Sequence, residues 1–320
     1  MGPASPREGR GRAMRPCTAH ADSSHPRDVI VETRQDAGVR QEEARRVESN
    51  AGKPRGVLYP RPDSRHFAHV RVLPSEDLRP WVEHFWAVRW DLRGQPPVSQ
   101  QTLPHPSVHW AFEAGISRVG GVNPGRFSVT LEGLGGVFSI KFRPGGFFPF
   151  VGTPLSTLTR RTVSPGMLLG PEALELEAAI LATDVTRDAD PERIALAESF
   201  LRARLPAPDP NVALVQGLVT RILEDRAVTK VEDLLTPGGP GLRTLQRLFN
   251  RYVGVNPKWV IQRYRLHEAA ERLRESPPPE LARLALELGY FDQAHFIRDF
   301  RRIVGRTPAG YARQAARYPL

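Results

Sequence analysis

Residues Gly289 to Tyr311 read GYFDQAHFIRDFRRIVGRTPAGY, and this stretch decides the fold of the C-terminal part of the chain. Glycine at position 289 suits a left-handed turn, and Asp292 is placed to cap the free amide hydrogens of a following helix. We therefore expect a helix that begins at Gln293. Its buried face follows the spacing i, i+4, i+7, i+8 and consists of Phe296, Phe300, Ile303 and Val304.

The opposite face of this predicted helix is polar, and it offers hydrogen-bond donors that suit base edges and phosphates in a major groove. An ordinary amphipathic helix with a solvated charged face would have the same pattern. The residues just upstream favour the first interpretation, because they predict a short amphipathic helix that ends at the glycine turn, giving a helix-turn-helix. The polar face carries His295, Arg298, Asp299 and Arg302, and the short helix carries Leu281, Leu284, Ala285 and Leu288.

A similar pair of helices is predicted about fifty residues earlier. Val231 and Leu234 begin its first helix, which should stop near Leu235 because prolines and glycines fill positions 237–241. The second helix begins after Gly241, a residue without a capping side chain. Its buried stripe is Leu242, Leu245, Leu248, Phe249 and Tyr252, and its outer face is Arg243, Gln246, Arg247 and Asn250.

One long helix is predicted between the two pairs. Proline is acceptable at the first position of a helix, and from Pro257 to about Arg274 no glycine or further proline interrupts the chain. Such a helix of roughly 18 residues would be about 27 Å long. Successive major grooves on one side of a duplex lie roughly 34 Å apart, so the length is of the right order. Its apolar surface is provided by Trp259, Ile261, Tyr264, Leu266, Ala270 and Leu273.

From about Pro210 to Tyr311 the chain resembles the DNA-binding domain of AraC/XylS-type transcription regulators. The resemblance is carried by RTLQRLF from Arg243, by GVNPKWVIQRYRLHEAAERL from Gly254, and by the opening stretch. It implies two helix-turn-helix units on one linking helix, each offering a recognition helix to successive major grooves. The implied base or phosphate contacts are Arg243, Gln246 and Arg247 in the first unit and Gln293, His295, Arg298 and Asp299 in the second, with Arg301 and Arg302 as phosphate contacts or solvated charges.

Three positions in the second unit have a further interpretation. His295 has an alternative role, since it can pack or form a hydrogen bond within the turn. Phe291 and Ala294 stand where the family favours small polar residues. We expect these two departures to alter contacts and not the architecture.

Charge is concentrated at the same end of the chain. Residues 241–320 hold 15 lysines and arginines against 7 acidic residues, whereas residues 57–240 hold 19 against 20. Release of counterions from phosphates by such a surface would make DNA binding salt-dependent. A merely soluble basic surface would give the same count.

The segment before these helices is predicted to be rich in strands. Apolar and polar residues alternate from Trp86 to Leu92, from Val108 to Phe112, from Phe127 to Leu131 and from Phe138 to Phe142. We also expect a short helix capped by Ser75, with Leu78, Val82 and Phe85 on one face. The order resembles the N-terminal sensing domain of some AraC-type regulators, with LPHPSVHWAF and IKFRPGG as the recognisable pieces. The aromatic residues are expected to form a core.

Metal binding in this domain is the main alternative. His105, His109 and Glu113 are residue types that hold metals in cupin-like barrels. Such barrels need a further histidine on a later strand, and no histidine lies between His109 and His267. Imidazoles bonded to backbone groups explain these residues without a metal.

The remaining segments set the domain boundaries. Residues 1–56 are rich in arginine, proline, glycine and serine and are predicted to be disordered; they hold Cys17, the single cysteine. Two helices are predicted around Pro171 to Leu181 and Pro191 to Leu205, and Asp209 is placed to cap a helix that begins at Pro210. No apolar run approaches the ~20 residues of a membrane span.

These observations predict an α+β fold with a disordered tail (1–56), a β-rich, barrel-like sensing domain (57–166), a helical linker (167–208) and an AraC-type DNA-binding domain (209–320). The predicted function is a cytoplasmic, sequence-specific transcription regulator without catalytic residues, metal or cofactor. Double-stranded DNA is the expected partner, and RNA polymerase, a small-molecule effector and a second copy of the chain are further candidates. The alternatives are a metal-dependent enzyme carried by the β-rich domain and an adaptor that docks an acidic protein.

Overall fold

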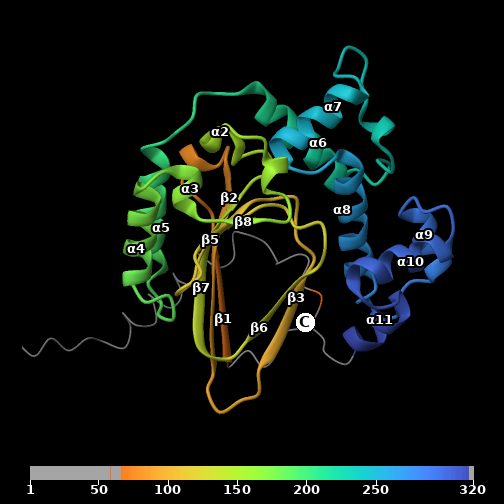
Figure 1. Cartoon of the computed structure of the whole chain (residues 1–320). Coiled ribbons are helices and arrows are strands. Elements are labelled where there is room, and N and C mark those ends of the chain that lie inside the picture. The colour runs from red at the N-terminus through yellow and green to blue at the C-terminus, as the bar shows by residue number, and fades with distance from the viewer. Residues whose placement is uncertain (1–57, 59–65, 317–320) are drawn as a thin grey trace, which may run out of the picture. The chain divides into compact units, whose positions relative to one another are not determined.

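Alternating apolar residues place the predicted strands in two antiparallel sheets. The computed structural model describes Leu58 and residues 66–316. Within these residues, six strands form a sheet in the order β1-β2-β7-β4-β5-β8, and β3 and β6 form a separate two-stranded ribbon (Figure 1). The strands are β1 (Phe67–Val72), β2 (Val82–Leu92), β3 (Val98–Thr102), β4 (His109–Phe112), β5 (Arg118–Gly120), β6 (Phe127–Leu131), β7 (Gly133–Phe142) and β8 (Thr162–Val163).

One face of the larger sheet is apolar and packs against helices. Phe85, Ile140 and Trp110 are paired in one row across β2, β7 and β4, and all three are fully buried. Helices α4 (Glu172–Ala182) and α5 (Asp190–Arg202) lie beside the sheet (Figure 1), and the ring of Phe200 on α5 meets Trp110 edge-on at 5.3 Å between centroids. Strand alternation therefore buries Trp110, Phe142 and Trp90, as predicted for the aromatic residues, whereas Phe127 on β6 is 40% exposed.

The next row on the same strands is polar and belongs to the opposite face. His84, Lys141 and His109 are paired across β2, β7 and β4, and Lys141 Nζ lies 2.8 Å from Glu83 Oε1. Burial, helped by the charge of Lys141, lowers the pKa of His109 to about 3. The neutral imidazole can therefore accept a hydrogen bond, and Trp86 Nε1 donates to its Nδ1 at 3.4 Å.

The predicted helix after Ser75 is wrong. Only a short 3-10 turn, η2 (Glu76–Leu78), forms there, and both Val82 and Phe85 belong to β2. Ser75 does not cap this turn, because its amide and hydroxyl donate to the carboxylate of Glu198 at 2.8 and 2.7 Å. Pairing with β7 gives the following residues a buried sheet position that a surface helix would not provide.

The predicted helices before and within the DNA-binding segment are confirmed in position. Asp209 caps α6, since its carboxylate accepts from Asn211 N. The remaining helical elements are α2 (Phe148–Val151), η3 (Leu155–Leu158), α3 (Pro165–Leu169), α6 (Pro210–Glu224), η4 (Val231–Leu234), α7 (Leu242–Leu248), a π-helical stretch η5 (Phe249–Val253), α8 (Pro257–Arg272), α9 (Leu281–Glu287), α10 (Gln293–Val304) and α11 (Pro308–Ala316).

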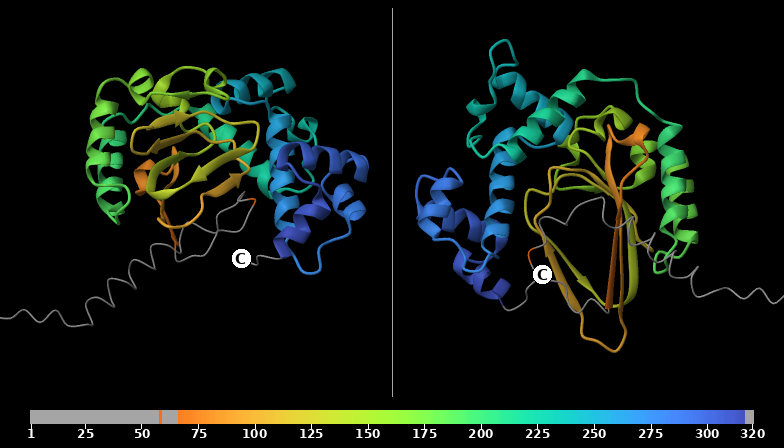
Figure 2. Two further views of the ribbon diagram at one scale, coloured as in Figure 1. Left: turned by 60° about the horizontal axis from the view of Figure 1, so that its bottom comes forward. Right: turned by 180° about the vertical axis from the view of Figure 1, so that it is seen from behind.

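Helix α8 connects two helical groups, as Figure 2 shows from two sides. Its 16 residues correspond to about 24 Å, slightly less than predicted, because the chain leaves the helix after Arg272. Val260 and Ile261 belong to the core that includes Leu245 of α7, whereas Ala269 belongs to the core that includes Phe296 of α10. One continuous helix is therefore built into both cores.

Hydrogen bonds also join the strand-rich part to the C-terminal helices. All described residues belong to one compact unit. Arg126, in the turn before β6, donates to the carbonyl oxygen of Val304 at 3.0 Å, and the buried Arg263 of α8 donates to the carbonyl of Gly125 at 3.2 Å. The predicted tail and Cys17 lie outside the described residues. Among the helices described here, none has the length and apolar character needed to cross a membrane.

Candidate nucleic-acid interface

The second helix-turn-helix unit begins with the turn that the sequence predicted. Gly289 has a φ of +76°, and a Cβ atom at this position would lie 2.6 Å from Cγ2 of Thr229. Asp292 accepts the amide hydrogen of His295 at 2.6 Å and so caps α10. Both the backbone conformation and the close approach therefore require glycine here, and the cap fixes where the recognition helix starts.

Helix α10 separates a buried face from an exposed one, as predicted. Phe296, Phe300 and Val304 are fully buried, and the ring of Phe300 meets Tyr311 of α11 edge-on at 5.7 Å. On the outer side, Gln293 and Arg298 are exposed. Within the described part of the chain, no hydrogen bond or ion pair occupies the side chains of these two residues. They remain available for an external partner.

The other predicted contacts of α10 interact with one another. Arg302 Nη2 donates to Asp299 Oδ1 at 3.1 Å, and His295 Nε2 lies 3.8 Å from Asp299 Oδ2. The side chain of Asp299 is only 16% exposed. The ring of His295 also packs edge-on against Tyr290 at 5.2 Å. His295 thus makes the packing contact expected as one of its two roles while its side chain stays 46% exposed, so its contact with DNA stays a prediction. Asp299 holds the guanidinium of Arg302.

The first unit is less regular, in the way that its prolines and glycines predict. Its first helix is the single 3-10 turn η4, and α7 starts at Leu242 after Gly241, which provides no side-chain cap. Leu242 was expected in the buried stripe, but it is 38% exposed because it lies in the uncapped first turn. The predicted contact residues Arg243, Gln246 and Arg247 are all exposed.

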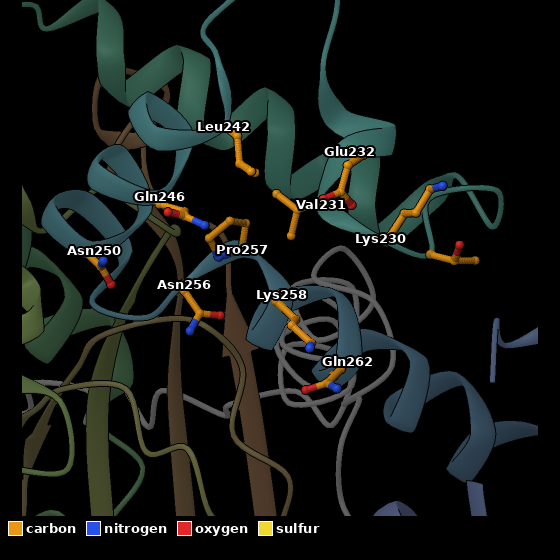
Figure 3. A pocket seen from close by; sticks show the side chains of 11 residues that line it. Lys230, Val231, Glu232, Leu242, Gln246, Asn250, Asn256, Pro257, Lys258 and Gln262 are labelled. Carbon is orange, nitrogen blue, oxygen red and sulfur yellow. The ribbon is translucent and has the colours of Figure 1, made fainter. Parts of the chain in front are cut away.

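A groove of about 540 Å³ lies between α7 and the start of α8. Figure 3 shows Gln246 and Asn250 on one wall and Lys258 and Gln262 on the other. Asn256 caps α8 beneath the groove by accepting from Trp259 N at 2.8 Å. The outer face of α7 therefore shares this groove with the amide and ammonium donors of α8.

Sequence reasoning did not assign Lys258 or Gln262 to the interface. Their helix was predicted, but only its apolar side was considered, and no periodicity relates them to α7. The burial of two arginines of α8, Arg263 and Arg265, was not predicted either. Arg265 donates to the carbonyl oxygens of Asp225 and Val228 at 2.8 and 2.9 Å, which fixes α8 to the loop after α6. A sequence cannot distinguish such an arginine from a solvated one.

The residues of the predicted metal alternative are not brought together. His109 is engaged with Trp86, and Glu113 pairs with Arg118 at 3.2 Å. The ring of His105 lies 4.5 Å from the ring of His267. Throughout the part of the chain that the structure describes, no group of three or more potential ligands has the geometry of a metal site.

Comparison with known families assigns the C-terminal helices. Residues 239–314 match the family described as helix-turn-helix domain. These residues form an AraC-type helix-turn-helix domain. The match runs from just before α7 into α11, so it includes α7, α8 and the second unit, but not η4 of the first unit. Residues 70–164 match a second family, described as a domain of unknown function (DUF6597), which corresponds to the strand-rich part.

The curated relatives of the AraC-type domain are transcriptional regulators. The activator NphR of Rhodococcus sp is 33% identical over 107 residues, which are 33% of this chain and 31% of that protein. The regulator ExsA of Pseudomonas aeruginosa is 32% identical over 81 residues, 25% and 28% of the two chains. The similarity thus spans less than a third of the length of these relatives. Among solved structures, ToxT of Vibrio cholerae aligns over 68% of this chain and 98% of its own, at 11% identity and a TM-score of 0.33.

Proposed function

We propose that the chain is a sequence-specific DNA-binding transcription regulator whose recognition helices, α7 and α10, enter successive major grooves of one duplex. The observation that carries this proposal is the integration of α8 into both helical cores, with exposed polar faces on α7 and α10. The names of the curated relatives support the same class of function.

The proposed contacts divide into two kinds. Arg298 and Gln293 in the second unit, and Arg243, Gln246 and Arg247 in the first, are exposed and suited to base edges, because arginine pairs with guanine and glutamine with adenine. Arg302, held by Asp299, and the exposed Arg301 are assigned to phosphates. Binding should weaken steeply as the salt concentration rises, because phosphate contacts release counterions.

Selection of bound duplexes from a random pool is the direct test. We expect the selected duplexes to share a motif with two elements about one helical turn, or ~10 base pairs, apart. Replacing Arg298 with Ala should then weaken binding to the recovered duplex about tenfold or more, with little effect on random DNA, because one bidentate pair is worth roughly 1 to 3 kcal/mol. An equal loss on both duplexes would reassign Arg298 to a phosphate. Recovery of no motif, together with nuclease-insensitive copurification of an acidic protein, would favour an adaptor instead.

We further propose that the strand-rich domain adjusts DNA binding, and that a cytoplasmic small molecule is its signal. The hydrogen bonds from Arg126 to Val304 at the end of α10, and from Arg263 to the turn before β6, support such coupling. RNA polymerase and a second copy of the chain are the further partners that this function would involve.

A further inference from the structure

Phe291 is the most exposed large apolar side chain in the described part of the chain. It is 89% exposed, ahead of Met167 at 81%. Burying a phenylalanine side chain stabilises a fold by roughly 1.5–3 kcal/mol, so this residue forgoes a contribution that most phenylalanines make. The fold gains nothing from its ring, which suggests a role outside the fold.

The backbone holds Phe291 firmly in this exposed position. On one side, Tyr290 is buried, and its amide donates to the carbonyl of Ala285 at 3.0 Å. On the other side, Asp292 caps α10 through His295 N. The turn therefore directs Tyr290 inward and Phe291 outward, and neither neighbour can move without breaking a contact. A ring presented in this way costs little further ordering when it meets a partner.

The position places the ring where the second unit would approach a duplex. Phe291 directly precedes the cap of α10, and the first residues of a recognition helix are those that meet base edges in a helix-turn-helix. Gln293 and Ala294, in the first turn, are exposed as well. Ala294 adds a second small apolar surface at this end of the helix.

The chemistry of the major groove offers one apolar group to such a surface, the C5 methyl of thymine, and phenylalanine and alanine are among the side chains that contact it. Asp292 follows Phe291 in the chain, and its carboxylate, which accepts the cap hydrogen bond, would disfavour a phosphate at this turn. We propose that Phe291, assisted by Ala294, recognises the methyl group of a thymine in the element bound by the second unit. This inference rests on the proposed function and adds a specificity-determining residue to it.

Substitution of deoxyuridine for thymine tests the inference, because it removes the methyl group and keeps every hydrogen-bonding group of the base. Each thymine in the second element of the duplex selected by the wild-type chain is replaced in turn. At one position the wild-type affinity should fall about fourfold, the effect of one buried methyl group. The Phe291→Ala variant should bind the thymine and deoxyuridine duplexes equally.

A matched control separates this contact from a general loss of apolar surface. Met167→Ala removes a similarly exposed side chain from α3 and should keep the fourfold ratio of the wild-type chain. Both variants should unfold at the wild-type temperature, because both side chains are exposed.

Two results would overturn the inference while leaving the proposed function intact. One is a selected duplex at which no thymine is sensitive to deoxyuridine. The other is an equal loss of affinity by Phe291→Ala on both duplexes, which would indicate a contact with the backbone. Failure of the wild-type chain to select any duplex would instead remove the proposed function, and the inference with it.

Discussion

At the scale of single residues, glycine and buried polar side chains impose the strictest requirements. Gly289 combines a φ of +76° with a neighbour, Thr229, that leaves no room for a Cβ atom. The sequence predicted the turn at Gly289 from its position between two helical patterns. It did not predict the contact with Thr229, which comes from the other helix-turn-helix unit, sixty residues earlier.

Replacing Gly289 with Ala should destabilise the chain by about 1 to 3 kcal/mol, because a left-handed backbone and a steric clash are imposed together. Urea unfolding followed by circular dichroism measures the change. Gly217→Ala is the matched control, since this glycine lies within α6 with open space around it and should instead stabilise by about 0.5–1 kcal/mol. Equal effects of the two substitutions would contradict the steric argument.

His109 should make stability fall in mild acid. In the unfolded chain a histidine titrates near its ordinary pKa of 6.5, whereas burial lowers the pKa of His109 to about 3. Between these values the unfolded state binds more protons, so stability decreases as the pH falls from 6.5, by at most about 1.4 kcal/mol per pH unit. Above pH 6.5 both states are neutral and the group contributes no pH dependence.

The His109→Asn variant keeps a hydrogen-bond acceptor for Trp86 and removes the titration. Between pH 7 and pH 5 the wild-type chain should therefore lose about 1–2 kcal/mol more stability than the variant does. Urea midpoints at the two pH values give the comparison. An identical loss in both proteins would mean that His109 binds its proton without opening the sheet.

At the scale of elements, the sequence was most informative where caps and periodicity agree. Helix α10 has a capping aspartate and a single apolar stripe, and its start at Gln293 was predicted. The helix expected after Ser75 had an apolar pattern, but no helical packing partner was identified for it. Instead, Val82 and Phe85 pair with β7 and form a strand. Local periodicity cannot predict pairing between segments some fifty residues apart.

Helix α7 lacks the side-chain cap that α10 has. Gly241 occupies its N-cap with extended backbone angles, φ −69° and ψ 168°, and a Cβ atom there would meet nothing within 4 Å. Gly241→Ser should therefore add a cap and stabilise the chain by about 0.5 kcal/mol. Gly238→Ala, in the same loop but at a φ of +73°, should destabilise it by about 1 kcal/mol. Opposite shifts of the two urea midpoints would agree with this account, whereas a loss in Gly241→Ser would mean that α7 does not begin at residue 242.

At the scale of the whole molecule, α8 joins the two helical units, because it belongs to the core of each. Its existence and approximate length followed from the absence of glycine and proline after Pro257. The contacts that attach α8 to the rest of the chain could not be predicted, because Arg263 and Arg265 donate to carbonyls in turns distant in sequence. Buried guanidinium groups that donate to backbone carbonyls fix α8 against the turn before β6 and the loop after α6, and the apolar core shared with Phe296 fixes α8 to the second unit.

This rigidity makes a prediction about the spacing of the two DNA elements. A half-turn insertion of ~5 base pairs between them puts the elements on opposite sides of the duplex, so binding should fall to the affinity of a single element. Insertion of a full turn, ~10 base pairs, restores the side but not the distance that a helix of about 24 Å can span, so affinity should stay low. Gel-shift titrations with the three duplexes measure both effects, and a duplex with one scrambled element gives the single-element reference. Recovery of full affinity at the full-turn insertion would mean that the units move independently and that α8 does not fix their spacing.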